Sequence, residues 1–281
     1  MLVFDGVAEA TKRKIALRER IQSLSLSAIP TVVSIVFEED TPSVKYASLK
    51  QKDAEAIGVS YQIQTLSLAD PMHHVHSVLS KSVSNRSIHG VIVQKPAGSL
   101  MPSAEWWNEV IAPLTPEKDL DGLTANRKVL PATARAVCEI LKLSMAELGV
   151  QLMGEKAVVL GRSEIVGKPV AQEFAETFGL DVELWGREAL QSWRDQNGKL
   201  AQPKPIQAKV LVVATGVSGL LLESDIMQDS IIIDCGAPKP EVEPENLDIK
   251  VAFLSPVPGG VGPMTRICLL ENLIDLVQYQ S

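Results

Sequence analysis

The chain of 281 residues is 46% hydrophobic and 22% charged, so it can form one large or two ordinary globular domains with a sizeable core. Its 27 basic and 34 acidic residues give a net charge of −7, which argues against nucleic acid or an anionic membrane as a partner. The three cysteines lie far apart and no apolar run resembles a signal peptide or a membrane span, which favours a cytoplasmic protein with reduced thiols.

Apolar strand-like and helical segments alternate along the chain, which predicts an α/β fold with parallel sheets. Thr41-Pro42 is typical of a helix start with Thr41 as the N-cap, and Gly58 is typical of a helix end. The elements predicted in the first half are helices at 7–24, 41–58, 72–83 and 104–111, and strands at 31–37, 59–66 and 90–94.

A second series of elements follows the loop at 114–122. The predicted helices are a connecting helix at 133–143, one that ends near residue 178, and a final helix from residue 264. The predicted strands are 157–160, 181–185, 210–214 and 231–234. The polar stretch at 195–205 is predicted to be a surface loop.

The segment 161–169, Gly-Arg-Ser-Glu-Ile-Val-Gly-Lys-Pro, follows a predicted strand and opens a helix. A dinucleotide-binding fold holds phosphates at this point, because glycine permits close backbone approach and the helix N-terminus offers unpaired N–H groups. Ala214-Thr-Gly216 and Asp234-Cys-Gly236 also end predicted strands, where open parallel sheets bind ligands. Because the spacing is not G-x-G-x-x-G, an ordinary strand–helix turn is the alternative.

The next strand ends in Trp185-Gly-Arg187. An acidic residue there would accept the ribose hydroxyl of NAD, whereas an arginine suits the additional phosphate of NADP. The sequence therefore favours NADP, with NAD or a solvated surface arginine as the alternatives.

Tyr46 and Lys50 lie four residues apart in a predicted helix and therefore share one face. A tyrosine can stack on a planar heterocycle, and a partly buried lysine with a lowered pKa can move protons or polarise water. Gln94 ends a buried strand, where an amide can orient a charged partner, and Asp121 can accept hydrogen bonds from an amino-pyrimidine edge. Taken alone, these residues also fit a surface Tyr/Lys pair and a turn-forming aspartate.

His73, His74 and His76 lie at a predicted helix start without matching carboxylates or cysteines, which favours a solvated helix end over a metal site. The segment 255–266 is more informative, because three glycines and three prolines stand directly before an apolar helical run. Such a stiff stretch with few side chains predicts a shaped wall against a flat ligand and not a linker.

Together these segments resemble the methylenetetrahydrofolate dehydrogenase/cyclohydrolase family. The resemblance rests on Asp5-Gly6, the Tyr46…Lys50 helix, Val93-Gln94, Lys118-Asp-Leu-Asp-Gly122, 161–167 and 256–265, in that order. It implies a folate-binding catalytic domain at 1–128 plus 255–281 and a Rossmann-like NADP-binding domain at 129–254. It also implies a cleft between the domains, a C-terminal helix that returns to the first domain, and homodimers formed through the cofactor domains.

The resemblance further implies that methylenetetrahydrofolate gives a hydride to NADP⁺ and that water opens the methenyl product to 10-formyltetrahydrofolate. Lys50 would be the main catalytic residue for the attack of water, Gln94 would tune it, Tyr46 would stack on the folate and Asp121 would hold the pterin. The remaining substrate-binding residues implied are Pro256, Gly259, Gly260 and Pro263. The cofactor-binding residues implied are Gly161, Arg162, Ser163, Ile165, Val166, Arg187, Ala214, Thr215, Gly216, Gly236, Gly262 and Thr265.

The chain departs from the family pattern around the expected site. Gln94-Lys-Pro-Ala-Gly98 replaces the usual Gln-Leu-Pro-Leu-Pro, so Lys95 adds a second cation, and Pro131-Ala-Thr-Ala134 replaces Pro-Cys-Thr-Pro. The loop after Asn126 is shortened, and the stretch 234–255 lacks a Gly-Asp-Val element. The alternatives are therefore a dehydrogenase with little cyclohydrolase activity, a non-catalytic folate or nucleotide-binding relative, and another two-domain dehydrogenase that acts on a shikimate-like acid.

Overall fold

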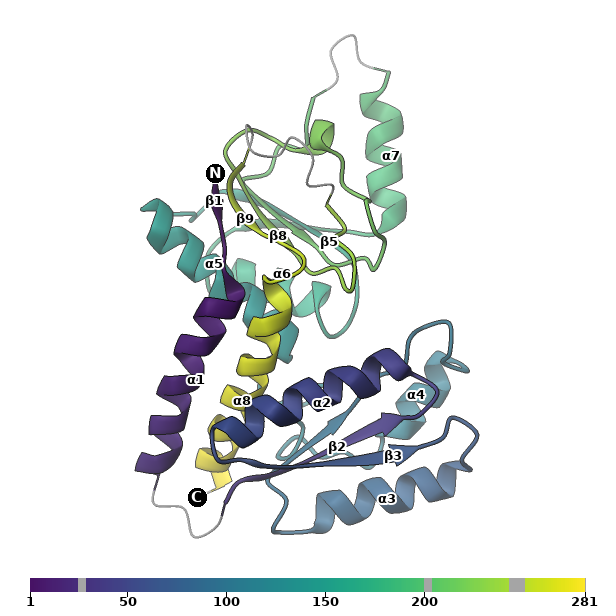
Figure 1. Ribbon diagram of the computed structural model, residues 1–281. Helices are drawn as coiled ribbons and strands as arrows, with labels where there is room; N and C mark the ends of the chain where they lie inside the picture. The colour runs from purple at the N-terminus through teal and green to yellow at the C-terminus, as the bar shows by residue number, and fades with distance from the viewer. Residues whose placement is uncertain (25–28, 200–203, 243–250, 281) are drawn as a thin grey trace. The chain divides into compact units, whose positions relative to one another are not determined.

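A computed structural model describes most of the chain, and Figure 1 shows its helices and strands. The described residues are 1–24, 29–199, 204–242 and 251–280. They form two compact units. Unit 1 consists of Met1–Ala10 and Thr133–Thr265, and unit 2 consists of Thr11–Ala132 and Arg266–Ser281.

Unit 1 contains a six-stranded parallel sheet in the order β1-β9-β8-β7-β5-β6. Its central strands are rich in valine and isoleucine and, apart from Lys156 at the start of β5, are buried, as expected for parallel strands that are covered on both faces. The strands are β1 (Leu2–Val3), β5 (Lys156–Leu160), β6 (Asp181–Trp185), β7 (Val210–Val213), β8 (Ser230–Asp234) and β9 (Val251–Ser255).

The path of the chain through this sheet creates a ligand-binding edge. From β5 the chain runs to β6 on one side and then returns to β7 on the other side of β5. Leu160 is in register with both Trp185 and Val213, so the three strands end in line. The loops diverge at this topological switch point, where open parallel sheets bind their ligands.

Unit 1 has three helices among its described residues, and one of them was not predicted. They are α5 (Ala132–Leu148), α6 (Gly167–Glu176) and α7 (Arg187–Asn197), with a short 3₁₀ turn, η1 (Glu223–Asp225). The prediction of a loop from residue 195 was wrong at its start, because α7 continues to Asn197, while residues 200–203 lie outside the described residues. The helix is mostly polar and buries only Leu190 fully, so its low apolar content is similar to that of a polar surface loop.

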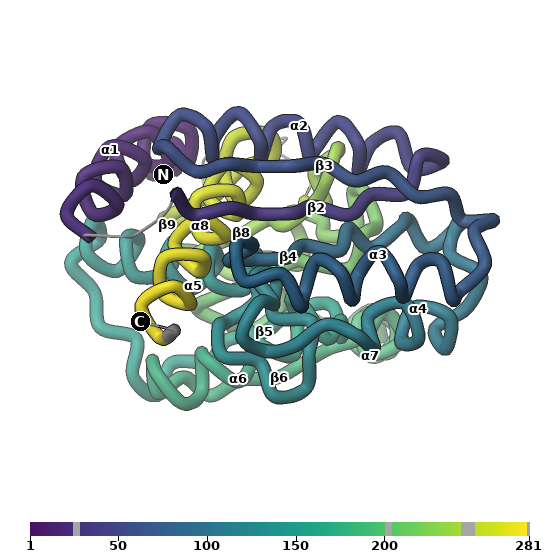
Figure 2. The backbone as a smooth tube through the Cα atoms, turned by 90° about the horizontal axis from the view of Figure 1, so that it is seen from below, coloured from purple at the N-terminus to yellow at the C-terminus, as the bar shows by residue number. Residues whose placement is uncertain are grey.

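Unit 2 is built on a three-stranded parallel sheet in the order β3-β2-β4, which Figure 2 shows from below. Its strands are β2 (Thr31–Phe37), β3 (Ser60–Leu66) and β4 (Gly90–Val93). Its helices are α2 (Thr41–Ala56), α3 (Met72–Ser84), α4 (Ala104–Ile111), and most of α1 (Gly6–Ser23) and α8 (Val261–Gln280). α2 covers one face of the sheet, and α3 and α4 enclose a hydrophobic cluster on the other (Figure 1).

The start of α2 corrects one detail of the sequence analysis. The N-cap is Asp40 and not Thr41, because the Asp40 carboxylate accepts hydrogen bonds from the Ser43 backbone at 3.3 Å and hydroxyl at 2.7 Å. Asp40 also accepts a hydrogen bond from the backbone of Ala97 at 3.0 Å. One buried carboxylate thus joins the start of α2 to the loop that follows β4.

The compact units differ from the predicted domains in three segments. Residues 129–132, predicted in the NADP-binding domain, lie in unit 2. Residues 1–10 belong to unit 1 because β1 pairs in parallel with β9, and residues 255–265, which follow β9, also remain in unit 1. The fold class is confirmed as α/β with parallel sheets and two units. No helix within the described part of the chain combines the length and the apolar content needed to cross a membrane.

Candidate active site

The candidate catalytic group of unit 2 is the amine of Lys50 on α2. Its side chain is only 4% exposed, and its Nζ lies 3.7 Å from Asp121 Oδ2 and 5.1 Å from the centre of the Tyr46 ring. Tyr46 is one helical turn before Lys50, so both side chains project from the same face of α2. The structure therefore brings together three of the four predicted catalytic residues.

The surroundings of Lys50 favour its neutral form more than water does. Burial lowers the pKa of Lys50, and the carboxylate of Asp121 opposes this shift. Burial also raises the pKa of the Tyr46 hydroxyl, so this group stays protonated near neutral pH. The site thus offers an amine with lowered basicity beside a neutral phenol ring.

The loop that carries Asp121 is held against β4. The Val91 backbone donates to the Lys118 carbonyl at 2.7 Å, and the Leu120 backbone donates to the Val91 carbonyl at 3.3 Å. From α8, the Asn272 side chain donates to the Leu120 carbonyl at 2.9 Å. These contacts fix the backbone directly before Asp121, so its carboxylate is held near Lys50. Asn272 is a positioning residue that the sequence analysis missed.

Gln94 follows β4 and is buried, with 8% exposure. Its backbone donates to the Ile35 carbonyl at 2.9 Å, which continues the pairing with β2. Its side-chain Nε2 is buried and has no hydrogen-bond partner among the described residues, which marks it as a donor available to a ligand. Lys95 is exposed, and its Nζ lies 5.6 Å from the centre of the Trp107 ring.

The candidate cofactor site of unit 1 lies at the end of β5. Gly161 has φ +119°, and a Cβ there would lie 2.2 Å from the Ala214 carbonyl oxygen. A Cβ on Gly167 would lie 1.8 Å from the Gly161 carbonyl oxygen. Only glycine permits β5, α6 and β7 to approach this closely, which is a requirement of a dinucleotide-binding turn.

The Ser163 side chain binds backbone N–H groups at the start of α6. Its hydroxyl oxygen accepts hydrogen bonds from the backbones of Val166 at 3.1 Å and Gly167 at 3.3 Å, so its own proton remains available for donation. Arg162 and Ser163 are exposed, whereas Ile165 and Val166 are half-buried. The exposed turn before a helix N-terminus suits an anionic group such as a phosphate.

Two arginines lie at the end of β6. Arg187 is exposed and begins α7, and a Cβ built on Gly186 would lie 3.5 Å from Arg162 Nε. The Glu188 carboxylate is also close, 3.0 Å from the same point. The guanidinium groups fit the ribose phosphate of NADP better than the free ribose hydroxyl of NAD.

Thr215 and Gly216 are bound by Glu241, a residue that the sequence analysis missed. The Glu241 carboxylate is buried and accepts hydrogen bonds from the backbones of Thr215 and Gly216, both at 2.8 Å, and from the Thr215 hydroxyl at 2.6 Å. These donors are therefore occupied, and the two residues can contact a cofactor only with their other atoms.

The shortened stretch after β8 folds around a second carboxylate. Asp234 accepts hydrogen bonds from the backbones of Gly236 at 2.8 Å, Glu241 at 2.9 Å and Val242 at 3.0 Å. The loop places the Glu241 carboxylate at the end of β7, although the Gly-Asp-Val element is absent. Residues 243–250 lie outside the described residues.

We expect Glu241→Ala to lower the free energy of unfolding by about 3 kcal/mol, because three hydrogen bonds to a buried carboxylate are lost. Denaturant unfolding at 25 °C would measure the change, and NADP binding should weaken with it. Glu155→Ala, at an exposed position of the same unit, is the control and should change stability by less than about 0.5 kcal/mol. Equal stability of the two variants would contradict this role of Glu241.

The 255–265 segment forms a compact turn in unit 1. The Gly260 backbone donates to the Pro256 carbonyl at 2.9 Å, and a Cβ on Gly260 would lie 2.3 Å from Ser255 Oγ. A Cβ on Gly6 would lie 2.3 Å from the Gly260 carbonyl oxygen, which explains Gly6 as a packing requirement.

The other predicted binding residues of this segment differ in their accessibility. Pro256, Gly259 and Pro263 are half-buried and Gly262 is exposed. Thr265 is 7% exposed, and its hydroxyl donates to the Val261 carbonyl at 2.9 Å. Its hydroxyl proton is therefore used within α8 and not offered to a ligand.

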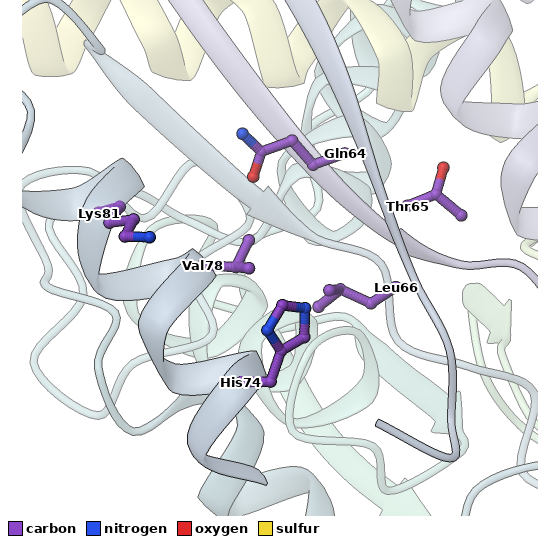
Figure 3. A pocket seen from close by; sticks show the side chains of 6 residues that line it. All are labelled: Gln64, Thr65, Leu66, His74, Val78 and Lys81. Carbon is purple, nitrogen blue, oxygen red and sulfur yellow. The ribbon is translucent and has the colours of Figure 1, made fainter. Parts of the chain in front are cut away.

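A cavity of about 310 Å³ lies between β3 and α3 and contains none of the predicted site residues. Figure 3 shows its lining residues, Gln64, Thr65, Leu66, His74, Val78 and Lys81. His76 Nε2 lies 2.8 Å from the Glu109 carbonyl oxygen, an ordinary link between α3 and α4. Across the described residues, no group of three or more His, Cys, Asp or Glu side chains could hold a metal ion.

The fold and the two sites define a two-unit α/β protein with a dinucleotide-type sheet and a separate unit that carries a buried lysine. Two family models match the chain: the catalytic domain of tetrahydrofolate dehydrogenase/cyclohydrolase over residues 4–121, and its NAD(P)-binding domain over residues 131–281. The chain therefore belongs to the tetrahydrofolate dehydrogenase/cyclohydrolase family.

Individual relatives agree with this assignment. The bifunctional protein FolD of Nitrosomonas eutropha is 31% identical over 99% of this chain and 94% of its own length. The 5,10-methylenetetrahydrofolate dehydrogenase of Bombyx mori has a TM-score of 0.85 at 26% identity, over 99% of this chain and 98% of its own. The same values hold for the dehydrogenase-cyclohydrolase of Trypanosoma brucei, solved with NADP cofactor and an inhibitor. The predicted family, two-activity enzyme class and NADP cofactor are confirmed at this level.

Proposed function

We propose that this protein oxidises 5,10-methylenetetrahydrofolate with NADP⁺ and hydrolyses the methenyl product to 10-formyltetrahydrofolate, with Lys50 as the group that activates water. The observation that carries the proposal is the buried Lys50 beside Asp121 and Tyr46, in the unit that matches the family's catalytic domain. Membership of the family supplies the substrate class.

The oxidation is chiefly a task of positioning. NADP⁺, when bound, supplies the nicotinamide carbon that accepts the hydride. The Gly161 turn, Arg162, Ser163 and Arg187 would hold its phosphates and ribose, and residues 256–265 would form the wall against the two flat rings. The protein would contribute orientation and exclusion of water, because hydride transfer requires no proton donor in the protein.

The hydrolysis requires a base, and Lys50 suits that role. Neutral Lys50 would accept a proton from water as the water oxygen bonds to the methenyl carbon. This leaves a hydroxyl on the carbon and no charge on the ring. The bond from the carbon to N5 then breaks, N5 takes the proton from Lys50, and the hydroxyl releases its proton to solvent as it becomes the oxygen of the formyl group on N10. The methenyl substrate is a cation, so it favours the neutral amine by charge repulsion, in the same direction as burial.

The neighbouring residues would hold the folate for both steps. Tyr46 would stack on the ring system, Asp121 would accept hydrogen bonds from the pterin, and the unpartnered amide of Gln94 would donate to the substrate. The alternative of a weak cyclohydrolase depends on repulsion between Lys95 and Lys50. Two observations count against this alternative. Lys95 Nζ lies over the Trp107 ring, and burial is the largest cause of the lowered pKa of Lys50.

The proposal also includes a homodimer, formed through the cofactor-binding units, in the cytoplasm. The family resemblance supports the dimer, and the widely separated thiols fit a reducing compartment. 10-Formyltetrahydrofolate is a formyl donor, so the product would serve one-carbon metabolism, including purine biosynthesis.

We expect purified protein, mixed with 5,10-methylenetetrahydrofolate and NADP⁺, to form NADPH without a build-up of the methenyl compound. Absorbance would follow NADPH and the methenyl compound separately. A methenyl build-up in the wild-type protein would reduce the proposal to a dehydrogenase. No reduction of either NADP⁺ or NAD⁺, with tight binding of folate, would indicate a non-catalytic relative. No folate binding would favour a different dehydrogenase.

A further inference from the structure

A cluster of three charged residues lies beside the candidate catalytic lysine in unit 2. Arg266 on α8 donates from Nε to Asp53 Oδ2 at 2.6 Å, and Lys14 on α1 pairs with the other oxygen of Asp53. Asp53 is largely buried, with 11% side-chain exposure. One carboxylate thus faces two cations, so the cluster keeps one positive charge in a chain whose net charge is −7.

The cluster lies on the same face of α2 as the site. Tyr46, Lys50 and Asp53 follow the spacing i, i+4 and i+7, which places them along one stripe of the helix. α8 meets α2 at this stripe through Arg266 (Figure 1). The charge of Arg266 also opposes the rise in the pKa of Tyr46 that burial causes, so the guanidinium is within electrostatic range of the phenol.

The Arg266 guanidinium has hydrogen-bond donors that Asp53 does not use. Asp53 occupies only its Nε, and within the described part of the chain its two terminal nitrogens have no acceptor. The side chain is 21% exposed, so these nitrogens remain accessible. An arginine held on one edge by a buried carboxylate is rigid and presents its other edge to a planar anion.

From this arrangement we infer that Arg266 binds a carboxylate of the glutamate tail of the folate substrate. This inference rests on the proposed function, in which Tyr46 and Lys50 contact the ring system of the same molecule. Folates carry carboxylates only on the glutamate tail, and a positive excess beside the ring site would attract them. Asp53 is then the positioning residue, and Arg266 is the group that touches the substrate.

The test compares binding of tetrahydrofolate with binding of tetrahydropteroate, which lacks the glutamate, by titration calorimetry in the presence of NADP⁺. We expect Arg266→Gln to raise Kd for tetrahydrofolate about tenfold, the loss of one charge-assisted hydrogen bond, and to leave Kd for tetrahydropteroate unchanged. Arg266→Lys should retain part of the affinity. Lys52→Gln removes the same charge from an exposed position of α2 and is the matched control, without effect.

Equal weakening of both ligands by Arg266→Gln, or no weakening of either, would overturn the inference. Calorimetry does not depend on turnover, so this result is separate from the proposed activity. If the wild-type protein binds tetrahydrofolate with the expected preference but does not reduce NADP⁺, the proposed function fails and the carboxylate site stands. If turnover is normal and the preference is absent, only the carboxylate site fails.

Discussion

Lys50→Met should leave the oxidation of methylenetetrahydrofolate largely intact and reduce hydrolysis about 10²- to 10⁴-fold, the usual contribution of a positioned acid or base. Methionine fills the buried volume of the lysine stem but has no amine, so the packing around residue 50 should be preserved. The expected signature is a methenyl compound that accumulates at nearly the rate of NADPH formation. Absorbance at the two wavelengths would measure both rates in one sample.

Lys95→Leu is the matched control for this experiment, because it removes an ammonium group from the same unit. Lys95 is exposed and lies over Trp107, so its loss should leave hydrolysis within about twofold of wild type. A large rise in hydrolysis would instead support the alternative in which Lys95 weakens Lys50. Equal loss of both activities in Lys50→Met would contradict a specific role in hydrolysis.

The rate of hydrolysis should also depend on pH in a defined direction. If neutral Lys50 is the base, kcat/KM for the methenyl substrate rises with pH and levels off above the pKa of Lys50. Burial lowers this pKa, so the plateau should begin below the ordinary lysine value of about 10.4. The spontaneous hydrolysis of the substrate would be subtracted at each pH.

Gly161→Ala should be highly damaging to unit 1, with a loss of at least about 3 kcal/mol in the free energy of unfolding. The added Cβ would lie 2.2 Å from the Ala214 carbonyl oxygen, and φ of +119° is unfavourable for alanine. Relief requires β5 and β7 to separate at the switch point, so NADP binding should be lost as well. Denaturant unfolding and calorimetry with NADP⁺ would measure the two effects.

Gly154→Ala separates the two causes of this loss. Gly154 has φ +79° in the same unit, but a Cβ there would meet no atom within 4 Å. Its cost should therefore be backbone strain alone, about 1 to 2 kcal/mol, without an effect on NADP binding. If both variants lost the same stability and both bound NADP⁺ normally, the close approach at Gly161 would not be needed for the cofactor turn.

Most of the fold could be predicted because its signals are local. The central strands β2, β5, β7 and β8 are short segments rich in valine and isoleucine, and the parallel arrangement requires the alternating helices that the sequence indicates. α7 was missed because it buries little, and β1 and β9 because a strand of two residues carries almost no pattern and its partner is short. Their pairing places the N-terminus in unit 1.

The candidate site likewise combines local features that the sequence predicts with contacts that depend on the fold. The sequence by itself determined the family, the shared face of Tyr46 and Lys50, and the glycine turn after β5, because helical spacing and a requirement for glycine are properties of a few adjacent residues. Only the tertiary structure decided the distant partners. Glu241 reaches Gly216 across 25 positions, Asn272 reaches Leu120 across 152, and Arg266 reaches Asp53 across 213. Such contacts leave no periodic signal, since their partners meet only when the chain has folded and a buried polar group must find a donor or an acceptor.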